Sequence, residues 1–344
     1  MKALLFPGDR TVELASVPDP VPGEGEVLIE MRYSAVCGSD LHRYRQPSAE
    51  RAATARVVTG HEPVGIARAL GPGVRWPKIN DRIVVYPLVG CNRPECSACR
   101  GRQPKLCANR RVMSGEIHGS NAEYQVVPAA SCLPLPEEFA WEEGALLACN
   151  FGTAYAAARK TMASGQSTIA VFGLGPVGLC TVVAARAMGA RVIGVDVVGE
   201  RLELARRAGA MAVVDAGAEE PVARIRALTD GLGCDAAIDT SGVSAGQTNA
   251  LNALRREGKV VVVGIGFGRE WSIRPREQLM VREVSIEGSF VYNLADWEPM
   301  LRFVRRQGVD LLPLISAIYA PEQAAEAFRR ADEGRSGKLL FRWR

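Results

Sequence analysis

The chain has 344 residues, of which 47% are hydrophobic and 23% charged, and its formal net charge is +4 at pH 7. This length exceeds one ordinary core, so two domains are expected. The small net charge argues against nucleic acid as a partner, and no apolar run reaches the roughly 18 residues that would predict a membrane span. Residues 1–10 contain a proline and an acidic residue too early for a secretory signal. With nine cysteines, an odd number, this predicts a cytoplasmic protein whose thiols bind metal.

The first 35 residues predict short strands over Lys2–Phe6, Val12–Leu14 and Glu26–Tyr33. A proline-broken turn at 18–23 separates the second from the third. Because parallel strands seldom connect so tightly, this part is expected to be antiparallel and to form a partly closed barrel.

A first group of potential metal ligands follows. The run from Cys37 to His42 reads Cys-Gly-Ser-Asp-Leu-His, and Gly-His-Glu follows at 60–62. A thiolate and an imidazole supply two of the positions that zinc usually takes. Cys37 alone is equally consistent with a small buried hydrophobe, and His61 with a hydrogen-bonded core histidine. Their pairing with the neighbouring polar residues favours a metal site, flanked by Ser39, Asp40, His42 and Glu62.

The second group is denser and lies within one short segment. Its four cysteines follow the pattern C-x4-C-x2-C-x7-C and are Cys91, Cys96, Cys99 and Cys107. Such spacing lets one loop place four thiolates around a tetrahedral ion, and a site closed in this way is structural. Zinc is favoured over an iron–sulfur cluster, a disulfide pair or a DNA-binding finger, since no recognition helix follows.

Further along, a turn and a strand are predicted over 119–127 and a helix over 137–147. His118 precedes them as a surface residue or a support for a ligand. Cys149 follows the helix and is by default a core cysteine. It becomes a third ligand only if the fold brings it to Cys37 and His61, which spacing alone does not show.

Strands and helices alternate from 168 to 288, which predicts a parallel, doubly wound sheet with right-handed crossovers. The predicted strands are Thr168–Phe172, Arg191–Val195, Ala212–Val214, Ala236–Asp239, Val260–Val263 and Val284–Glu287. The predicted helices are Val177–Met188, Glu200–Ala208, Val222–Thr229, Gly246–Leu254 and Arg276–Met280.

A glycine-rich loop opens this region directly after its first strand. Residues Gly173, Leu174, Gly175, Pro176, Val177 and Gly178 fit the G-x-G-x-x-G pattern, which lets backbone N–H groups approach a pyrophosphate at a helix N-terminus. The next strand ends at Asp196, the spacing at which a carboxylate binds the adenosine ribose hydroxyls. The sequence therefore predicts a nicotinamide dinucleotide site, to which Thr240, Gly264 and Arg201 are also assigned.

The end of the chain returns to a mixed pattern. Helices are predicted around Leu301–Gln307 and Pro321–Ala331, and a strand over Lys338–Arg342. We expect them to complete the first domain, which gives a domain of residues 1–155 with 297–344 and an inserted dinucleotide-binding domain of residues 156–296.

Together these motifs resemble the zinc-containing medium-chain dehydrogenase/reductase family, which includes alcohol, sorbitol and threonine dehydrogenases. The resemblance runs from Lys2 to about Lys338. It implies an α/β fold with a GroES-like, β-barrel-type catalytic domain and a Rossmann domain. It also implies two zinc ions per chain, NAD, and a homodimer or homotetramer.

Individual roles carry over from this resemblance. Cys37, His61 and Cys149 match the catalytic zinc ligands and Glu62 a conditional ligand, while Cys91, Cys96, Cys99 and Cys107 match the structural zinc lobe. Ser39 and His42 match the proton relay, and Asp40 matches the carboxylate behind the ligating histidine. One departure is the four residues between the first two lobe cysteines, where the family usually has two.

The expected activity is zinc-dependent hydride transfer between a primary or secondary alcohol or polyol and NAD. A threonine- or amino-cyclitol-type 3-hydroxy dehydrogenase, a zinc-free reductase and a non-catalytic dinucleotide-binding protein stay open as alternatives. Asp196 would repel a 2′-phosphate, so NAD is expected over NADP. The substrate pocket is predicted around Ser39, Tyr44, the Gln46–Arg56 loop, Phe151 and Phe290–Asn293.

Overall fold

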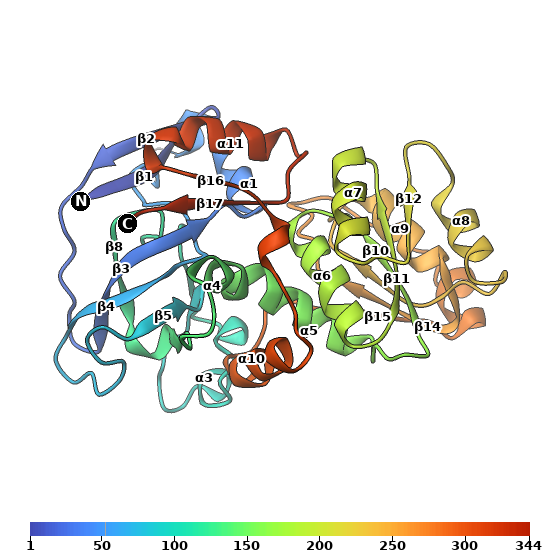
Figure 1. Ribbon diagram of the computed structural model, residues 1–344, viewed down its shortest axis with the longest axis horizontal. Coiled ribbons are helices and arrows are strands. Elements are labelled where there is room, and N and C mark those ends of the chain that lie inside the picture. Colours follow the sequence, from blue (N-terminus) through green and yellow to red (C-terminus); the bar gives the residue numbers. More distant parts are fainter. Residues whose placement is uncertain (52) are drawn as a thin grey trace.

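The computed structural model describes residues 1–51 and 53–344. It has a β-rich half, which contains both chain ends, and a second half built on a sheet with helices around it (Figure 1). None of the described helices is long and apolar enough to cross a bilayer.

The β-rich half is built on a seven-stranded sheet. Its strands come from both parts of the chain: β3 (Glu26–Ala35), β4 (Val64–Leu70), β5 (Arg82–Val85), β8 (Tyr124–Pro128), β9 (Cys132–Pro134), β16 (Ile315–Tyr319) and β17 (Lys338–Arg342). The order is β16-β17-β3-β4-β5-β9, and β8 also pairs with β3. All pairs are antiparallel, as predicted, except β16 with β17.

Smaller elements cover this sheet. The hairpin of β1 (Lys2–Gly8) and β2 (Thr11–Ser16) lies under α11 (Ala324–Asp332), whose Phe328 packs edge-on against Phe6 with ring centroids 4.8 Å apart. Short helices α1 (Asp40–Tyr44) and α2 (Ser48–Arg51) follow β3. The cysteine-rich loop carries α3 (Ser97–Arg100) and η1 (Pro104–Leu106), and a small sheet of β6 (Leu88–Val89) and β7 (Arg111–Val112) flanks it.

The second half is a six-stranded parallel sheet in the order β12-β11-β10-β13-β14-β15. Its strands are β10 (Thr168–Phe172), β11 (Arg191–Asp196), β12 (Ala212–Asp215), β13 (Cys234–Asp239), β14 (Leu254–Val262) and β15 (Ser285–Gly288). The helices are α6 (Pro176–Ala187), α7 (Gly199–Arg207), α8 (Pro221–Ala227) and α9 (Ser244–Asn252). This is the doubly wound order predicted from the alternation, with the switch point beside β10.

The strand register aligns the carboxyl ends of the central strands. Phe172 pairs with Val195 on one side and with Asp239 on the other. The glycine loop after β10, Asp196 at the end of β11 and Thr240 after β13 therefore meet at one edge of the sheet, where ligands bind in open α/β folds.

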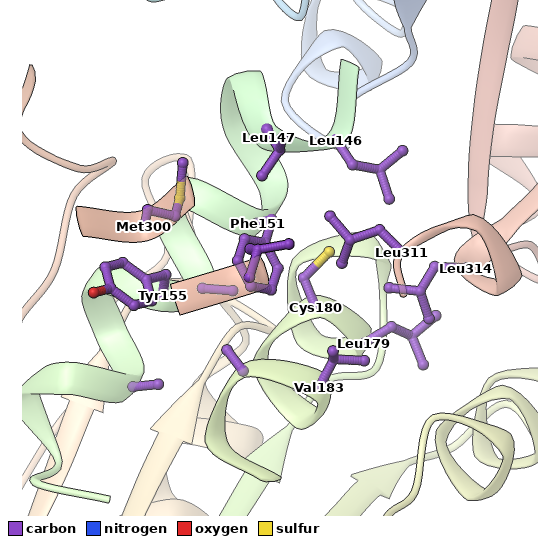
Figure 2. Close-up of a cluster of buried hydrophobic side chains, with 14 of the residues drawn as sticks. Leu146, Leu147, Phe151, Tyr155, Leu179, Cys180, Val183, Met300, Leu311 and Leu314 are labelled. Atoms are coloured by element: carbon purple, nitrogen blue, oxygen red, sulfur yellow. The ribbon is translucent and has the colours of Figure 1, made fainter. Parts of the chain in front are cut away.

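A continuous helical segment joins the two halves. It consists of α4 (Trp141–Leu146), the π-helix η3 (Leu147–Phe151) and α5 (Gly152–Lys160). Figure 2 shows the apolar cluster between this segment, α6 and the chain near α10 (Trp297–Arg306) and η7 (Leu312–Leu314). The labelled side chains are Leu146, Leu147, Phe151, Tyr155, Leu179, Cys180, Val183, Met300, Leu311 and Leu314. Each large apolar side chain buried here stabilises the fold by about 1.5–3 kcal/mol, so the segment that carries Cys149 is firmly held.

Four helix predictions differ from the structure. The helix predicted around Leu301–Gln307 begins earlier, at Trp297, and ends at Arg306. The helix expected over 137–147 begins at Trp141, because Glu143 Oε2 accepts a hydrogen bond from the N–H of Ala140 at 2.9 Å and fixes the start there. Leu254 does not end a helix. It is the first residue of β14, whose pairing with β13 shifts register between Cys234 and Ala236. Residues 275–282 form a π turn and a 3₁₀ turn, η4 (Pro275–Leu279) and η5 (Met280–Arg282), in place of the expected short α-helix.

The remaining elements are η2 (Ala129–Ser131), η6 (Leu294–Asp296) and η8 (Pro321–Gln323). The strands of the β-rich sheet come from residues 26–134 and 315–342, and those of the parallel sheet from 168–288. The domain limits at 155/156 and 296/297 stay predictions.

Candidate active site

Four potential metal ligands converge from distant parts of the chain. Cys37 follows β3, His61 and Glu62 precede β4, and Cys149 lies in the π-helix η3. One ligand atom of each lies within 4.8 Å of the others. Two thiols, an imidazole and a carboxylate form a donor set that fits zinc. The structure thus brings Cys149 to Cys37 and His61, which the spacing alone did not show.

Asp40 organises this cluster through both carboxylate oxygens. Oδ2 accepts a hydrogen bond from the Cys37 backbone N–H at 2.9 Å, and Oδ1 lies 3.1 Å from Nδ1 of His61. Asp40 is 2% exposed. The contact with Nδ1 turns Nε2 of His61 toward the thiols, and Ser39 Oγ lies 3.5 Å from that nitrogen.

The π-helix sets the direction of Cys149. A π turn shifts the following side chains around the helix axis, and such turns often occur at functional sites. The buried Tyr292 donates from its hydroxyl to the carbonyl of Ala148 at 2.9 Å. Cys149, Asn150 and Thr153 line the cavity as a result.

Neighbouring groups in the cluster shift one another's pKa values. A hydrogen bond from Cys149 and the neighbouring His61 together outweigh burial and hold the pKa of Cys37 well below its usual range. Burial lowers the pKa of His61, but the charges of Asp40 and Cys37 outweigh it and leave that pKa well raised. The Cys37 hydrogen bond and burial raise the pKa of Cys149. A thiol whose pKa is lowered, next to a second thiol and an imidazole, suits a bound cation.

Glu62 has a partner that the sequence did not reveal. Its carboxylate contacts Nζ of Lys338 from β17, and that ammonium group also donates to the carbonyl of Val36 at 2.8 Å. Both side chains are buried. Burial raises the pKa of Glu62 to about 8, although the charge of Lys338 acts to lower it. Its role as a conditional metal ligand stays a prediction.

The second cysteine group also forms a cluster. Cys91 Sγ lies 3.9 Å from Cys99 Sγ, and Cys96 Sγ lies 3.8 Å from Cys107 Sγ. Tetrahedral zinc with Zn–S bonds of about 2.3 Å needs sulfur atoms about 3.8 Å apart, so the four thiols fit that ion. All four are free cysteines, so the structure gives the disulfide alternative no support. Backbone hydrogen bonds, chiefly from Cys91, lower the pKa of Cys107 to about 6. The longer first spacing therefore leaves Cys91 inside the cluster.

A cavity of about 800 Å³ connects the first cluster to the glycine loop. Cys37, His61 and Cys149 lie in its wall with Gly173, Gly175, Pro176, Val177, Gly178, Thr240 and Gly264. Gly173 has φ +85°, and a Cβ at Gly178 would lie 1.9 Å from the Gly173 carbonyl oxygen. Both positions therefore need glycine, and the helix N-terminus that they expose is suited to a pyrophosphate.

Asp196 lies at the same edge and is tied to the loop. Its Oδ2 accepts from the N–H of Leu174 at 2.6 Å, and its Oδ1 accepts from Val197 and Val198 at 2.8 and 3.0 Å. Arg201 Nη1 lies 3.7 Å from Oδ2. Both side chains line the cavity, the place predicted for the adenosine ribose.

Comparison with known proteins agrees with this geometry. Residues 23–137 match the alcohol dehydrogenase GroES-like domain, and residues 176–306 match the zinc-binding dehydrogenase domain. An uncharacterised zinc-type alcohol dehydrogenase-like protein of Escherichia coli K12, YphC, is 34% identical over 99% of this chain and 98% of its own length. The sorbitol dehydrogenase of Bacillus subtilis 168 is 32% identical over 96% of this chain and 93% of its own.

Solved structures agree as well. The alcohol dehydrogenase TADH from Thermus sp. ATN1 superposes with a TM-score of 0.91 at 26% identity, covering 99% of both chains. A short-chain alcohol dehydrogenase (rspB) from E. coli CFT073, solved with NADH, superposes with a TM-score of 0.88 at 25% identity, again over 99% of both chains. The chain belongs to the zinc-type alcohol dehydrogenase family.

Within this dehydrogenase fold, the predicted substrate pocket needs correction. Ser39, Phe290 and Val291 line the cavity, but Tyr44 packs against Phe6 and Phe328, and Phe151 is fully buried. The described residues of the Gln46–Arg56 loop do not line it, and Ala52 lies outside the described residues. Proximity to a motif in the sequence says little about the direction in which an aromatic or loop side chain points.

His42 occupies the open side of this dehydrogenase cavity. It is exposed, and its ring stacks on Phe267 from the other half, with centroids 4.1 Å apart and planes 7° apart.

Sequence reasoning did not assign Lys338, Asn150 or Thr153 to the site. A lysine in the otherwise apolar strand 338–341 was a signal for a buried partner, whereas nothing marked Asn150 beyond its place next to Cys149.

Proposed function

We propose that this protein is an NAD-dependent zinc dehydrogenase that oxidises an alcohol or polyol to the carbonyl compound, in the cytoplasm. The observation that carries the proposal is the convergence of Cys37, His61 and Cys149 in the wall of the cavity that also contains the glycine loop. That arrangement supports the proposal, because a metal bound at the cluster and a dinucleotide bound at the loop would both be within reach of one substrate.

In this proposal, different residues support the metal and the cofactor. Zinc bound to this cluster would supply Lewis-acid chemistry that eases loss of a proton from an alcohol, and NAD bound at the glycine loop would supply a hydride acceptor. Asp40 holds His61 in the orientation that presents Nε2 to the cluster, a contact that also makes the imidazole a stronger donor. Asp196 holds the glycine loop and offers its carboxylate to the ribose.

We propose that Ser39 and His42 help to carry the alcohol proton toward solvent. Ser39 Oγ lies beside the cluster, 3.5 Å from His61 Nε2, and is the first acceptor of the alcohol proton. His42, whose ring is exposed, releases the proton to solvent. A histidine suits this last step because its ordinary pKa lies near neutral pH.

The zinc lobe at Cys91–Cys107 has a different role. Its four thiols leave no position for a substrate oxygen, so a zinc ion there stabilises the loop between β6 and β7. We propose two zinc ions per chain and, from the family, a homodimer or homotetramer. Metal analysis and light scattering of the purified protein test these two statements.

A substrate panel tests the activity itself. Primary alcohols, polyols, inositols, threonine and amino-sugar alcohols are each offered with NAD and with NADP, and reduced cofactor is measured by its absorbance. Turnover of an alcohol or polyol with NAD is the expected result. Binding of NADH without turnover on any member, or on any hydroxy acid or polyol phosphate, would show a non-catalytic dinucleotide-binding protein. Efficient turnover of threonine alone would move the protein to the amino-alcohol class.

A further inference from the structure

The wall of the cavity contributed by the β-rich half contains two arginines. Arg43 follows His42 on α1, and Arg110 lies between the zinc lobe and β7. Both line the cavity together with Val112, Met113 and Phe290. They share this cavity with Cys37, His61 and Cys149, the cluster that a substrate must reach.

Neither guanidinium has an acidic partner. Among the described residues, no carboxylate oxygen lies within 4 Å of a side-chain nitrogen of Arg43 or Arg110. Arg43 donates to the carbonyl of Ser114, and Arg110 donates to the carbonyl of Cys107 at 3.5 Å while its guanidinium lies 6.0 Å from the ring centroid of Phe290. Neutral carbonyls hold the two side chains in place and leave their charges uncompensated.

A third arginine, Arg51, lies near Arg43 but does not line the cavity. Arg51 is 3% exposed and donates to the carbonyls of Phe6 and Thr54. Burial and the nearby charge of Arg43 lower the pKa of Arg51. The two carboxylates that the described lining contains, Asp40 and Asp196, are already engaged by His61 and by the glycine loop.

We propose that the alcohol substrate is anionic, and that Arg43 and Arg110 bind its carboxylate or phosphate group while its hydroxyl reaches the Cys37–His61–Cys149 cluster. This inference rests on the proposed dehydrogenase function and names its substrate class. Guanidinium groups bind such oxyanions through charge-assisted and often bidentate hydrogen bonds.

The cofactor's own phosphates are a weaker explanation for these arginines. The pyrophosphate position is fixed by the glycine loop at the N-terminus of α6, in the other half of the molecule. Arg201, beside Asp196, is the cation on that side. A variant at Arg43 therefore separates the two roles through the Michaelis constants for substrate and for NAD.

The test compares matched neutral and anionic substrates at saturating NAD. Glucitol, gluconate and glucitol 6-phosphate form one set, and glycerol, glycerate and glycerol phosphate form another. We expect at least one anionic member to exceed its neutral counterpart about tenfold or more in kcat/KM. Since a hydrogen bond to a charged group contributes about 1.5–3 kcal/mol, Arg43→Gln and Arg110→Gln should each raise the KM for that anion about 10–100-fold and leave the KM for NAD unchanged.

Three controls keep the result interpretable. Arg43→Lys retains the charge and should recover part of the affinity, and Arg45→Gln removes a neighbouring arginine that pairs with Asp332 outside the cavity and should change nothing. Calorimetric titration of the zinc-loaded protein–NADH complex with gluconate and with glycerol phosphate measures anion binding without turnover. If neutral polyols are oxidised as efficiently as anions, and neither glutamine variant changes the KM for the anion, the inference is overturned. The proposed dehydrogenase function would then remain intact. Absence of turnover on every alcohol would overturn the proposed function, and the titration would then decide the anion site alone.

A separate observation concerns Asn150. It is 1% exposed, lines the cavity beside Cys149, and neither its Oδ1 nor its Nδ2 has a hydrogen-bond partner among the described residues. A buried amide left without partners is unfavourable by about 1–3 kcal/mol. Because Asn150 lies in the cavity wall, its amide is available to a ligand bound there.

We infer that Asn150 hydrogen-bonds a second hydroxyl of the substrate, next to the carbon that is oxidised. A hydroxyl both donates and accepts, as the amide does. Asn150→Ala should lower kcat/KM about 10–100-fold for a vicinal diol and less than about threefold for a simple alcohol. Thr153→Val removes a polar group at another lining position with little change in side-chain size. It tests whether loss of any polar group from this wall lowers kcat/KM for the diol in the same way. Equal losses for both substrates, or a raised KM for NAD, would show that Asn150 serves the fold or the nicotinamide instead.

Discussion

The two cysteine clusters are built in opposite ways. Cys91, Cys96, Cys99 and Cys107 come from one loop of the chain, whereas Cys37, His61, Glu62 and Cys149 come from three separate segments. The first cluster has four equivalent thiols. The second combines thiols, an imidazole and a carboxylate in a cavity wall, with Asp40 and Lys338 behind them. The contrast shows that a local cluster stabilises its own loop, while a cluster assembled by the fold can retain an open side for chemistry.

The largest expected effect comes from removing a ligand of the cavity cluster. Cys149→Ser should lower kcat at least about 10³-fold, because Lewis-acid stabilisation by a metal contributes several kcal/mol to the transition state. Metal analysis should show loss of one of the two expected zinc ions. Cys180→Ser, which changes a buried cysteine outside the cavity lining, is the matched control. Unchanged turnover in the Cys149 variant would contradict the assignment of the two clusters.

A smaller effect on metal binding and activity is expected from changing Asp40, which supports two of the ligands. Asp40→Asn keeps the size of the side chain but weakens its contact with His61 Nδ1 and its acceptance from the Cys37 N–H. Loss of such a supporting group lowers metal affinity or activity about 10–100-fold. Zinc affinity, measured by competition with a chelator, should fall for the cavity ion and remain the same for the lobe ion. A loss at both sites would mean that Asp40 supports the whole β-rich half.

The cofactor end of the cavity gives a third effect. Asp196→Ser removes the charge that repels a 2′-phosphate, so the ratio of kcat/KM for NAD over NADP should fall about tenfold or more. The variant also loses part of the contact with the Leu174 N–H, so some loss with NAD itself is expected. Both zinc ions should remain bound. A wild-type preference for NADP would refute the role given to Asp196.

The smallest effect on turnover is expected at the lobe. Cys99→Ser should remove the second zinc ion and lower Tm by several degrees, because metal binding to a folded site contributes to stability. At temperatures well below the new Tm, kcat should change less than about threefold. The readouts are thermal unfolding and initial rates of the same preparation. A collapse of kcat without loss of stability would show that the lobe takes part in catalysis.

The sequence predicts features built from one short segment better than features assembled from distant segments. The lobe was predicted from spacing, because its ligands lie within 17 residues of one another in one loop. The strands from Thr168 to Gly288 and the glycine loop were predicted from periodicity, and the doubly wound sheet confirms their arrangement. Cys149 required the family resemblance, since nothing local distinguishes a ligand from a core cysteine.

Other features were beyond sequence reasoning for physical reasons. The pairing of Lys338 with Glu62 joins residues 276 positions apart, and only the placement of β17 beside β3 reveals it. Tyr44 and Phe151 were assigned to the pocket but lie in the core, because a one-residue change in helix phase turns a side chain from cavity to interior. The π-helix at 147–151 has no sequence signal that distinguishes it from an α-helix, and yet it sets the direction of Cys149 and Asn150.

The place of β17 in the sheet has a consequence for the order in which the protein matures during synthesis. Every strand of the parallel sheet leaves the ribosome before β16 and β17, so the dinucleotide-binding half can acquire its structure while the other half still lacks two of its strands. Lys338, the counter-ion of Glu62, lies on β17 and follows all of those strands. The nascent protein therefore acquires this buried ion pair only after the whole parallel sheet has been synthesised.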